Sequence, residues 1–208
     1  MKLKVCGIRT YEQMQQLQKL GVNYAGMIFY EESKRHIGEL SEAEREKMKA
    51  LTIRKVGVFV NAEYDAIVKA IGDYGLYAVQ LHGDETDEFC LELMGKAKVI
   101  KVFRVANQTS IDELVKPFEA VCDYYLFDTD TAQYGGSGKQ FDWNILEEAV
   151  IDKPFFLSGG IGLEDAGKLQ TFQHPCLYAV DVNSRFETAP GVKDMRKVEM
   201  FIKRINHE

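Results

Sequence analysis

The chain has 208 residues, of which 46% are hydrophobic, so it is long enough for one large core or two small ones. A net charge of −6 argues against nucleic acid or an anionic membrane as the main partner, although a local positive pocket is enough to bind a small anion. The N-terminus has no apolar leader, and the longest apolar runs, such as residues 24–30, are too short to span a bilayer. We therefore expect a cytoplasmic protein.

Eight short runs rich in β-branched and aromatic residues recur along the chain, and each is predicted to form a strand. They cover residues 2–7, 24–30, 55–60, 77–82, 97–103, 123–128, 154–158 and 177–182. The segments between them carry apolar residues at three- and four-residue spacing, which predicts helices. Regular alternation of strand and helix is typical of a parallel sheet with crossover helices.

Eight such units fit either a closed (β/α)8 barrel or an open doubly wound sheet. An open sheet would usually begin with a glycine-rich turn, whereas the first turn here reads CGIRT and lacks G-x-G-x-x-G. No proline-, serine- or charge-rich linker divides the chain. We therefore predict an α/β fold, a single (β/α)8 barrel domain spanning residues 1–208, close to the lower size limit of about 200 residues for such barrels.

A barrel places its active site at the C-terminal ends of the strands. Reactive or polar residues stand at those ends: Cys6, Tyr30, Asn61, His82, Arg104, Asp128, Ser158 and Asp181. The two longest strand-to-helix connections, 31–40 and 129–141, open from the same rim and are candidate covers for a substrate.

Strand parity bears on the role of Cys6. Alternate side chains share a face, so Lys4 and Cys6 point together, toward the barrel axis if Leu3 and Val5 face the helices. Asp128 would then lie across the mouth from Cys6, and a thiol and a carboxyl facing one pocket suit a general base and a general acid. A buried thiol and an aspartate that caps a turn explain the parity equally well.

A phosphate-binding site is the second functional feature that the sequence predicts. Barrels often hold a phosphate between the loops that follow strands seven and eight. The seventh predicted strand ends in Ser158-Gly159-Gly160, where two glycines allow a close backbone approach to an anion. The eighth is followed by Ser184 and Arg185, a hydroxyl and a guanidinium. The alternative is that the glycines only form a tight turn.

The remaining sequence patterns are weaker indications of function. GGSGK at 135–139 lacks the glycine and the hydroxyl residue that a nucleotide P-loop needs, so we reject a nucleotide site. A flexible cover whose Lys139 contacts the substrate and a merely mobile loop fit the segment equally well. Arg35 offers a planar fork for a carboxylate, but on the residues alone a solvated charge run is the preferred interpretation. Gln80 and His82 share a face of the fourth strand, without the companions of a nucleophilic triad. The four cysteines, 6, 90, 122 and 176, suggest neither disulfides nor a metal site.

These residues together resemble the phosphoribosylanthranilate isomerase family. The matching segments are KVCGIRT (4–10), IFYEESKRHI (28–37), VGVFVN (56–61), VQLHGDE (79–85), FDTDTAQYGGSGKQFDW (127–143), LSGGIG (157–162) and DVNSRFETAPGVKD (181–194). Seven segments in order along nearly the whole chain make the resemblance highly specific.

The resemblance implies tryptophan biosynthesis and an Amadori rearrangement of N-(5-phosphoribosyl)anthranilate, a small anionic substrate, by a monomer or homodimer without metal or organic cofactor. It implies that Cys6 is the general base, Asp128 the general acid and Arg35 the partner of the anthranilate carboxylate. Phosphate would bind at Gly159, Gly160 and Ser184. Lys4, Gln80, His82 and Asp181 are the remaining expected substrate-binding residues.

Two departures from the family pattern stand out. Glu31 replaces a usual proline, and Arg185 replaces a usual glycine, which would strengthen or crowd phosphate binding; we favour strengthening. The chemistry also requires an unusual order of acidities, so we hypothesise that Lys4 stabilises a Cys6 thiolate while desolvation keeps Asp128 protonated. Another sugar-phosphate isomerase or epimerase, or a non-catalytic sugar-phosphate-binding barrel, is the alternative function.

Overall fold

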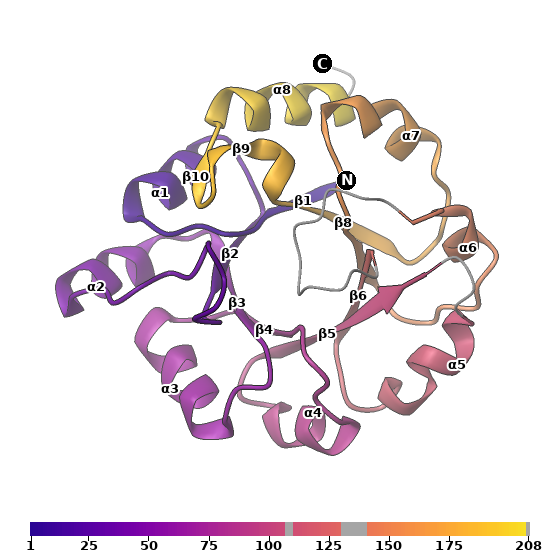
Figure 1. Ribbon diagram of the computed structural model, residues 1–208, viewed down its shortest axis with the longest axis horizontal. Coiled ribbons are helices and arrows are strands. Elements are labelled where there is room, and N and C mark those ends of the chain that lie inside the picture. The colour runs from indigo at the N-terminus through magenta and orange to yellow at the C-terminus, as the bar shows by residue number, and fades with distance from the viewer. Residues whose placement is uncertain (107–109, 130–140, 207–208) are drawn as a thin grey trace.

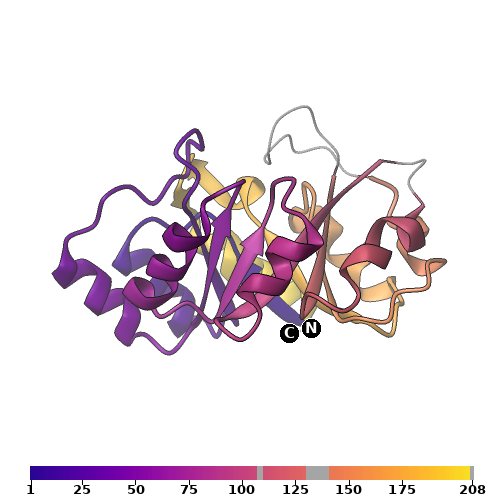
Figure 2. The ribbon, with the colours of Figure 1, turned by 90° about the horizontal axis from the view of Figure 1, so that it is seen from below.

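A computed structural model describes residues 1–106, 110–129 and 141–206 of the chain. Eight parallel strands pair in chain order, and β8 returns to pair with β1, which closes the barrel. Figure 1 shows the strands as a ring with the helices packed around its outside, and Figure 2 shows the same barrel from the side. The predicted (β/α)8 barrel is confirmed.

Each predicted strand forms, with ends that differ by at most two residues from those expected. The strands are β1 (Lys2–Val5), β2 (Tyr24–Ile28), β3 (Arg54–Phe59), β4 (Ala78–Leu81), β5 (Lys98–Val105), β6 (Tyr124–Thr129), β7 (Phe155–Leu157) and β8 (Leu177–Val182). A small antiparallel hairpin, β9 (Glu187–Ala189) with β10 (Val192–Lys193), follows β8 and was not predicted.

The helices occupy the segments with three- and four-residue spacing, and several begin at a side chain that caps their free backbone N–H groups. Ser41 forms a reciprocal capping box with Glu44 at the start of α2, and Thr10 and Asp194 cap α1 and α8. The helices are α1 (Tyr11–Lys19), α2 (Glu42–Ala50), α3 (Tyr64–Tyr74), α4 (Asp87–Leu93), α5 (Ile111–Val115), α6 (Asn144–Glu147), α7 (Ala166–Thr171) and α8 (Met195–Ile205), with 3-10 turns η1 (Lys116–Phe118), η2 (Leu163–Asp165) and η3 (Ser184–Phe186).

The buried apolar residues divide into two clusters, one on each face of the closed sheet. The larger cluster lies between strands and helices and includes Leu3 and Val5, as strand parity predicts. The smaller one fills the barrel interior with Tyr24, Val56, Ala78, Ile100, Val102, Leu126, Phe156 and Ala179. Lys4 and Cys6 are buried but belong to neither cluster, so the C-terminal part of the interior includes polar and reactive groups.

Within the described ranges, no helix has the length and apolar character needed to cross a membrane.

Candidate active site

Lys4 lies in β1 directly opposite Asp181 in β8, and this register brings their side chains together inside the barrel. The Lys4 Nζ donates to Asp181 Oδ2 at 2.7 Å, and the two side chains are 0% and 6% exposed. Burial alone lowers the pKa of Lys4, but Asp181, with a smaller contribution from Cys6, outweighs it and raises the pKa above 10.5. Lys4 is therefore a buried ammonium. The other Asp181 oxygen, Oδ1, is buried without a partner in the described structure.

Cys6 follows β1 and shares the interior face with Lys4. Its residue is only 4% exposed, and its sulfur lies against β2, where a Cβ at Gly26 would be 2.8 Å from Sγ. Gly26 thus makes room for the thiol. Burial raises the pKa of Cys6, while Lys4 and Lys193 lower it and offset part of that rise. Lys4 acts in the hypothesised direction, but burial outweighs it, so the pKa of the Cys6 thiol is raised instead of lowered.

His82 links the fourth strand to the sixth at the mouth of the barrel. Its Nδ1 lies 3.2 Å from Gln80 Nε2, and its Nε2 lies 3.5 Å from Asp128 Oδ2. Asp128 Oδ1 accepts a hydrogen bond of 2.8 Å from the Thr129 N–H. The Asp128 side chain is 15% exposed, so it borders the opening while most of it is removed from solvent. Gln80 Oε1, deeper inside, is buried with no described partner.

The loops after β7 and β8 have the backbone that the phosphate hypothesis needs. Gly159 and Gly160 both have positive φ, +97° and +62°, and a Cβ at Gly159 would be 2.3 Å from Thr129 Oγ1. Only glycine fits there. Ser184 begins η3, and Arg185 reaches across to Glu164 Oε1 at 3.2 Å. Arg185 therefore ties the two loops together through an exposed ion pair.

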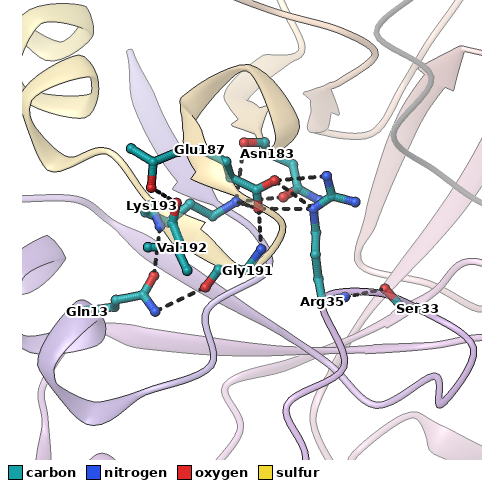
Figure 3. A network of polar contacts seen from close by, with 9 residues as sticks. Gln13, Ser33, Arg35, Asn183, Glu187, Gly191, Val192 and Lys193 are labelled. Atoms are coloured by element: carbon teal, nitrogen blue, oxygen red, sulfur yellow. Dashed lines mark hydrogen bonds and ion pairs between the residues drawn. The ribbon is translucent and has the colours of Figure 1, made fainter.

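Arg35 comes from the long loop after β2 and meets a carboxylate of the chain itself. Its Nε and Nη2 donate to both oxygens of Glu187, at 2.8–3.0 Å. Glu187 also accepts from Lys193 Nζ at 2.6 Å (Figure 3). The alternative of a solvated charge run at Arg35 is thus excluded, because a paired guanidinium on a buried carboxylate is a fixed structural element.

Sequence reasoning did not single out Glu187 or Lys193, although both lie in the segment DVNSRFETAPGVKD that resembled the family. Lys193 is fully buried and donates to Asn183 Oδ1 at 2.6 Å as well as to Glu187. From the sequence alone, a lysine in a charged segment is expected to be exposed to solvent. The burial of Lys193 results from the fold of the β9–β10 hairpin, which the sequence did not predict. The GGSGK segment, with Lys139, lies outside the described residues.

Among the described residues, no group of three or more His, Cys, Asp or Glu side chains is placed to hold a metal ion. The site is instead a set of cations and unpartnered acceptors at the C-terminal ends of the strands, the pattern of a pocket for a polar anionic ligand.

Comparison with known proteins decides the family. The sequence profile described as N-(5'phosphoribosyl)anthranilate (PRA) isomerase matches residues 3–204. The chain belongs to the phosphoribosylanthranilate isomerase family. The resemblance found in the sequence motifs is therefore confirmed, and it covers nearly the whole chain.

Members of the family from several bacteria are similar along their full length. The N-(5'-phosphoribosyl)anthranilate isomerase of Parabacteroides distasonis is 40% identical, covering 100% of this chain and 94% of that protein. That of Phocaeicola vulgatus is 38% identical, with coverage of 100% and 99%. The crystal structure of the Thermotoga maritima family member superposes with a TM-score of 0.86 at 33% identity, and coverage is 100% of both chains.

Another family structure contains a ligand. A phosphoribosyl anthranilate isomerase in complex with reduced 1-(o-carboxyphenylamino)-1-deoxyribulose 5-phosphate has a TM-score of 0.82 and 30% identity, over 100% of both chains. That ligand carries a carboxylate, a sugar chain with hydroxyls and a phosphate.

Proposed function

We propose that this chain converts N-(5'-phosphoribosyl)anthranilate to 1-(2-carboxyphenylamino)-1-deoxyribulose 5-phosphate in tryptophan biosynthesis. The observation that carries the proposal is the buried Cys6 beside the Lys4 ammonium, with Asp128 at the mouth of the same barrel end. Family membership supplies the reaction, and these side chains supply the acid and base that it needs.

Asp128 acts as the general acid. It gives a proton to the furanose ring oxygen as the bond between that oxygen and C1′ breaks, which leaves a protonated Schiff base. Its neighbour His82, 3.5 Å from Oδ2, helps to orient the carboxyl. The substrate's own nitrogen is the electron sink for the next step, so the reaction needs neither a metal ion nor an organic cofactor.

Cys6 acts as the general base. Its thiolate removes the C2′ proton, and the resulting enolamine tautomerises to the ketone. Burial favours the neutral thiol through a raised pKa, whereas two buried ammonium groups, Lys4 and Lys193, favour the thiolate. We propose that the positive charge that develops on the Schiff base adds to theirs, so that Cys6 loses its proton only when substrate is bound.

The remaining residues bind the two ends and the middle of the substrate. Arg35 receives the anthranilate carboxylate, and Gly159, Gly160, Ser184 and Arg185 receive the phosphate. The unpartnered oxygens of Asp181 and Gln80 are acceptors, and sugar hydroxyls are donors of matching chemistry. A buried acceptor without a partner is costly, so filling it with a substrate hydroxyl contributes to both affinity and specificity.

The decisive experiment is an assay of the purified chain on freshly prepared N-(5'-phosphoribosyl)anthranilate, together with complementation of an isomerase-deficient tryptophan auxotroph. We expect turnover and growth without tryptophan, and loss of both in Cys6→Ala. Absence of turnover by the folded wild-type chain would refute the proposal.

We also propose a cytoplasmic location and a monomeric or homodimeric state. All four cysteines are free, which suits a reducing compartment. The Thermotoga maritima family member is described as dimeric, with monomers obtained from it. Size-exclusion chromatography with light scattering distinguishes the two states.

A further inference from the structure

Glu187 lies at the centre of a polar network between two loops of the site (Figure 3). It is the first residue of the β9–β10 hairpin, and each of its oxygens accepts more than one hydrogen bond. Arg35 donates to both oxygens, and Lys193 Nζ and the Gly191 N–H donate to Oε1 at 2.6 and 3.1 Å. Four donors from three residues therefore fix the position of one carboxylate.

The hairpin that carries Glu187 is itself anchored. Gln13 in α1 donates to the Gly191 carbonyl at 3.1 Å and accepts from the Lys193 N–H at the same distance. The side chains of Glu187 and Lys193 are almost fully buried, and Arg35 and Lys193 together hold the pKa of Glu187 below its usual range against the opposing effect of burial. Glu187 is thus an ionised, immobile acceptor.

This acceptor occupies only one side of the Arg35 guanidinium. Nε and Nη2 bind Glu187, whereas Nη1 donates to no described residue, and Figure 3 shows it pointing away from the hairpin. A second carboxylate therefore finds donors on another edge of the guanidinium, the one formed by Nη1 and Nη2. Two cations, Arg35 and Lys193, face one anion, Glu187, so the network keeps an excess positive charge for it.

The network lies directly over the general base. Gly7 follows Cys6 with φ of +78°, and a Cβ there would be 3.1 Å from Arg35 Cδ and 3.3 Å from Lys193 Nζ. The Arg35 side chain therefore passes across the backbone next to Cys6, so a shift of the guanidinium moves the point where a bound carboxylate is held relative to the thiol.

We infer that Glu187 is a positioning residue for substrate recognition: by gripping one edge of Arg35, it presents the other edge to the ring carboxylate of the substrate. This inference rests on the proposed function. Glu187 touches no substrate atom itself, and it acts through Arg35. Specificity for a carboxylated amine therefore depends on a carboxylate of the protein.

Glu187→Gln tests this inference, because positioning and simple charge predict effects of opposite sign. Removing an anion beside the site strengthens the attraction of any anionic ligand, so a charge effect alone gives tighter binding. Weaker hydrogen bonding between residue 187 and Arg35 leaves the guanidinium poorly positioned, so the carboxylated ligand should bind more weakly. We expect the affinity for the reduced product analogue, measured by calorimetry, to fall at least tenfold, and KM to rise while kcat changes less than threefold.

A second ligand makes the readout specific. The matching reduced analogue without the ring carboxylate should bind wild type and Glu187→Gln within a factor of two of each other, because it does not use Arg35. In an Arg35→Met background, Glu187→Gln should have no further effect on the preference for the carboxylated analogue. Equal losses for both ligands, or tighter binding of the carboxylated one, would overturn the inference.

Two further variants keep the test decisive. Glu199→Gln removes the same charge from an exposed pair with Lys203 on α8, and we expect it to change neither ligand's affinity. If Glu187→Gln does not fold, Glu187→Asp retains the charge on a shorter side chain, and a smaller loss restricted to the carboxylated analogue is expected. Failure of the wild type to bind either analogue would count against the proposed function, whereas binding without selectivity in the variants counts only against the role of Glu187.

Discussion

The two ends of the barrel interior are both polar, but they are polar in different ways. At the C-terminal end, the Lys4–Asp181 pair and Gln80 are buried with two acceptor oxygens, Asp181 Oδ1 and Gln80 Oε1, left without described partners. At the N-terminal end, Tyr24, Tyr124 and Tyr178 pack against Phe156. Tyr77 packs against Tyr24, and the hydroxyls of the four tyrosines bond to one another and to Arg54.

The N-terminal group, called the tyrosine cluster here, consists of Tyr24, Tyr77, Tyr124 and Tyr178 with their cations. Tyr24 Oη bonds to Tyr178 Oη at 2.6 Å and accepts from Arg54 at 2.9 Å. The Lys2 ammonium lies 3.9 Å from the centre of the Tyr178 ring. No hydroxyl of this cluster is among the buried unpartnered atoms. One end satisfies its own polar groups, and the other leaves groups that a ligand can satisfy.

This contrast predicts that substitutions at the two ends of the barrel interior affect different properties of the protein. Changes at the C-terminal end should impair catalysis or leave a charge unpaired, and changes in the tyrosine cluster should affect only stability.

The largest effect is expected from the proposed general acid and general base. Cys6→Ala and Asp128→Asn should each lower kcat by about 10³-fold, within the range that general acid–base groups contribute. Steady-state assays of both variants, with circular dichroism to verify folding, measure this. Cys176→Ala is the matched control, because Cys176 is a free cysteine that bonds to the Ile151 carbonyl away from the site, and its kcat should stay within twofold. Near-normal turnover in either site variant would mean that the residues are misassigned.

Lys4→Met should produce the next largest effect, on stability. It leaves Asp181 as a buried charge without its partner, which costs about 3–5 kcal/mol of the free energy of unfolding. Asp181 raises the pKa of Lys4 above 10.5 against the effect of burial, so the contribution of the ammonium is present below that pH and is lost as the pH rises through the higher value. Burial also raises the pKa of Asp181, so the ion pair is lost at low pH, when this carboxyl takes up a proton. Urea unfolding at neutral pH measures the loss.

The comparison for Lys4→Met is the exposed pair of Lys98 with Asp123, near the other end of the barrel. Lys98→Met should cost at most about 1 kcal/mol, because exposed ion pairs contribute little. Equal costs for the two lysine variants would show that burial does not distinguish the pairs.

The sequence was informative about this molecule wherever one residue pattern has one structural outcome. Alternating strands and helices predicted the barrel, and strand parity placed Lys4 and Cys6 inside it, because side chains in a strand must alternate. The positive φ angles of Gly159 and Gly160, in the loop proposed to bind phosphate, agree with the expectation that adjacent glycines serve backbone conformations that other residues avoid.

The sequence did not predict features that depend on contacts between residues far apart in the chain. The sequence pattern does not predict the contact between Arg35 and Glu187, which lie 152 positions apart in the chain. The two strands of the β9–β10 hairpin have only five residues together, too few to show a strand periodicity. The direction of the pKa shift of Cys6 also could not be predicted from the sequence. Parity indicated that Lys4 is close, but only the packing shows that burial outweighs two neighbouring ammonium groups and raises the thiol pKa.

A smaller effect is expected from Tyr24→Phe in the tyrosine cluster. The hydroxyl that is removed is the partner of both Arg54 and Tyr178, so stability should fall by about 1–2 kcal/mol while kcat and KM stay within twofold. Tyr125→Phe is the matched control, since the Tyr125 hydroxyl is buried without a described partner, and its removal should be neutral or stabilising. A loss of activity in Tyr24→Phe with unchanged stability would contradict the division between the two ends.

The smallest effect is a change in proton binding within the same cluster. Burial raises the pKa of Tyr178, but hydrogen bonds from Lys2, Tyr24 and Tyr124 outweigh it and lower the pKa from 10.0 to about 8. A lowered pKa means that the folded chain releases this proton first, so stability should increase between pH 8 and pH 10 and this increment should disappear as the pH falls through 8. Ultraviolet difference spectra should show one phenolate forming near pH 8 in the folded protein, absent in Tyr178→Phe. Because kcat depends on groups at the other end of the barrel, the activity of Tyr178→Phe should follow the wild-type pH profile, and a displaced profile would indicate that the two ends are coupled.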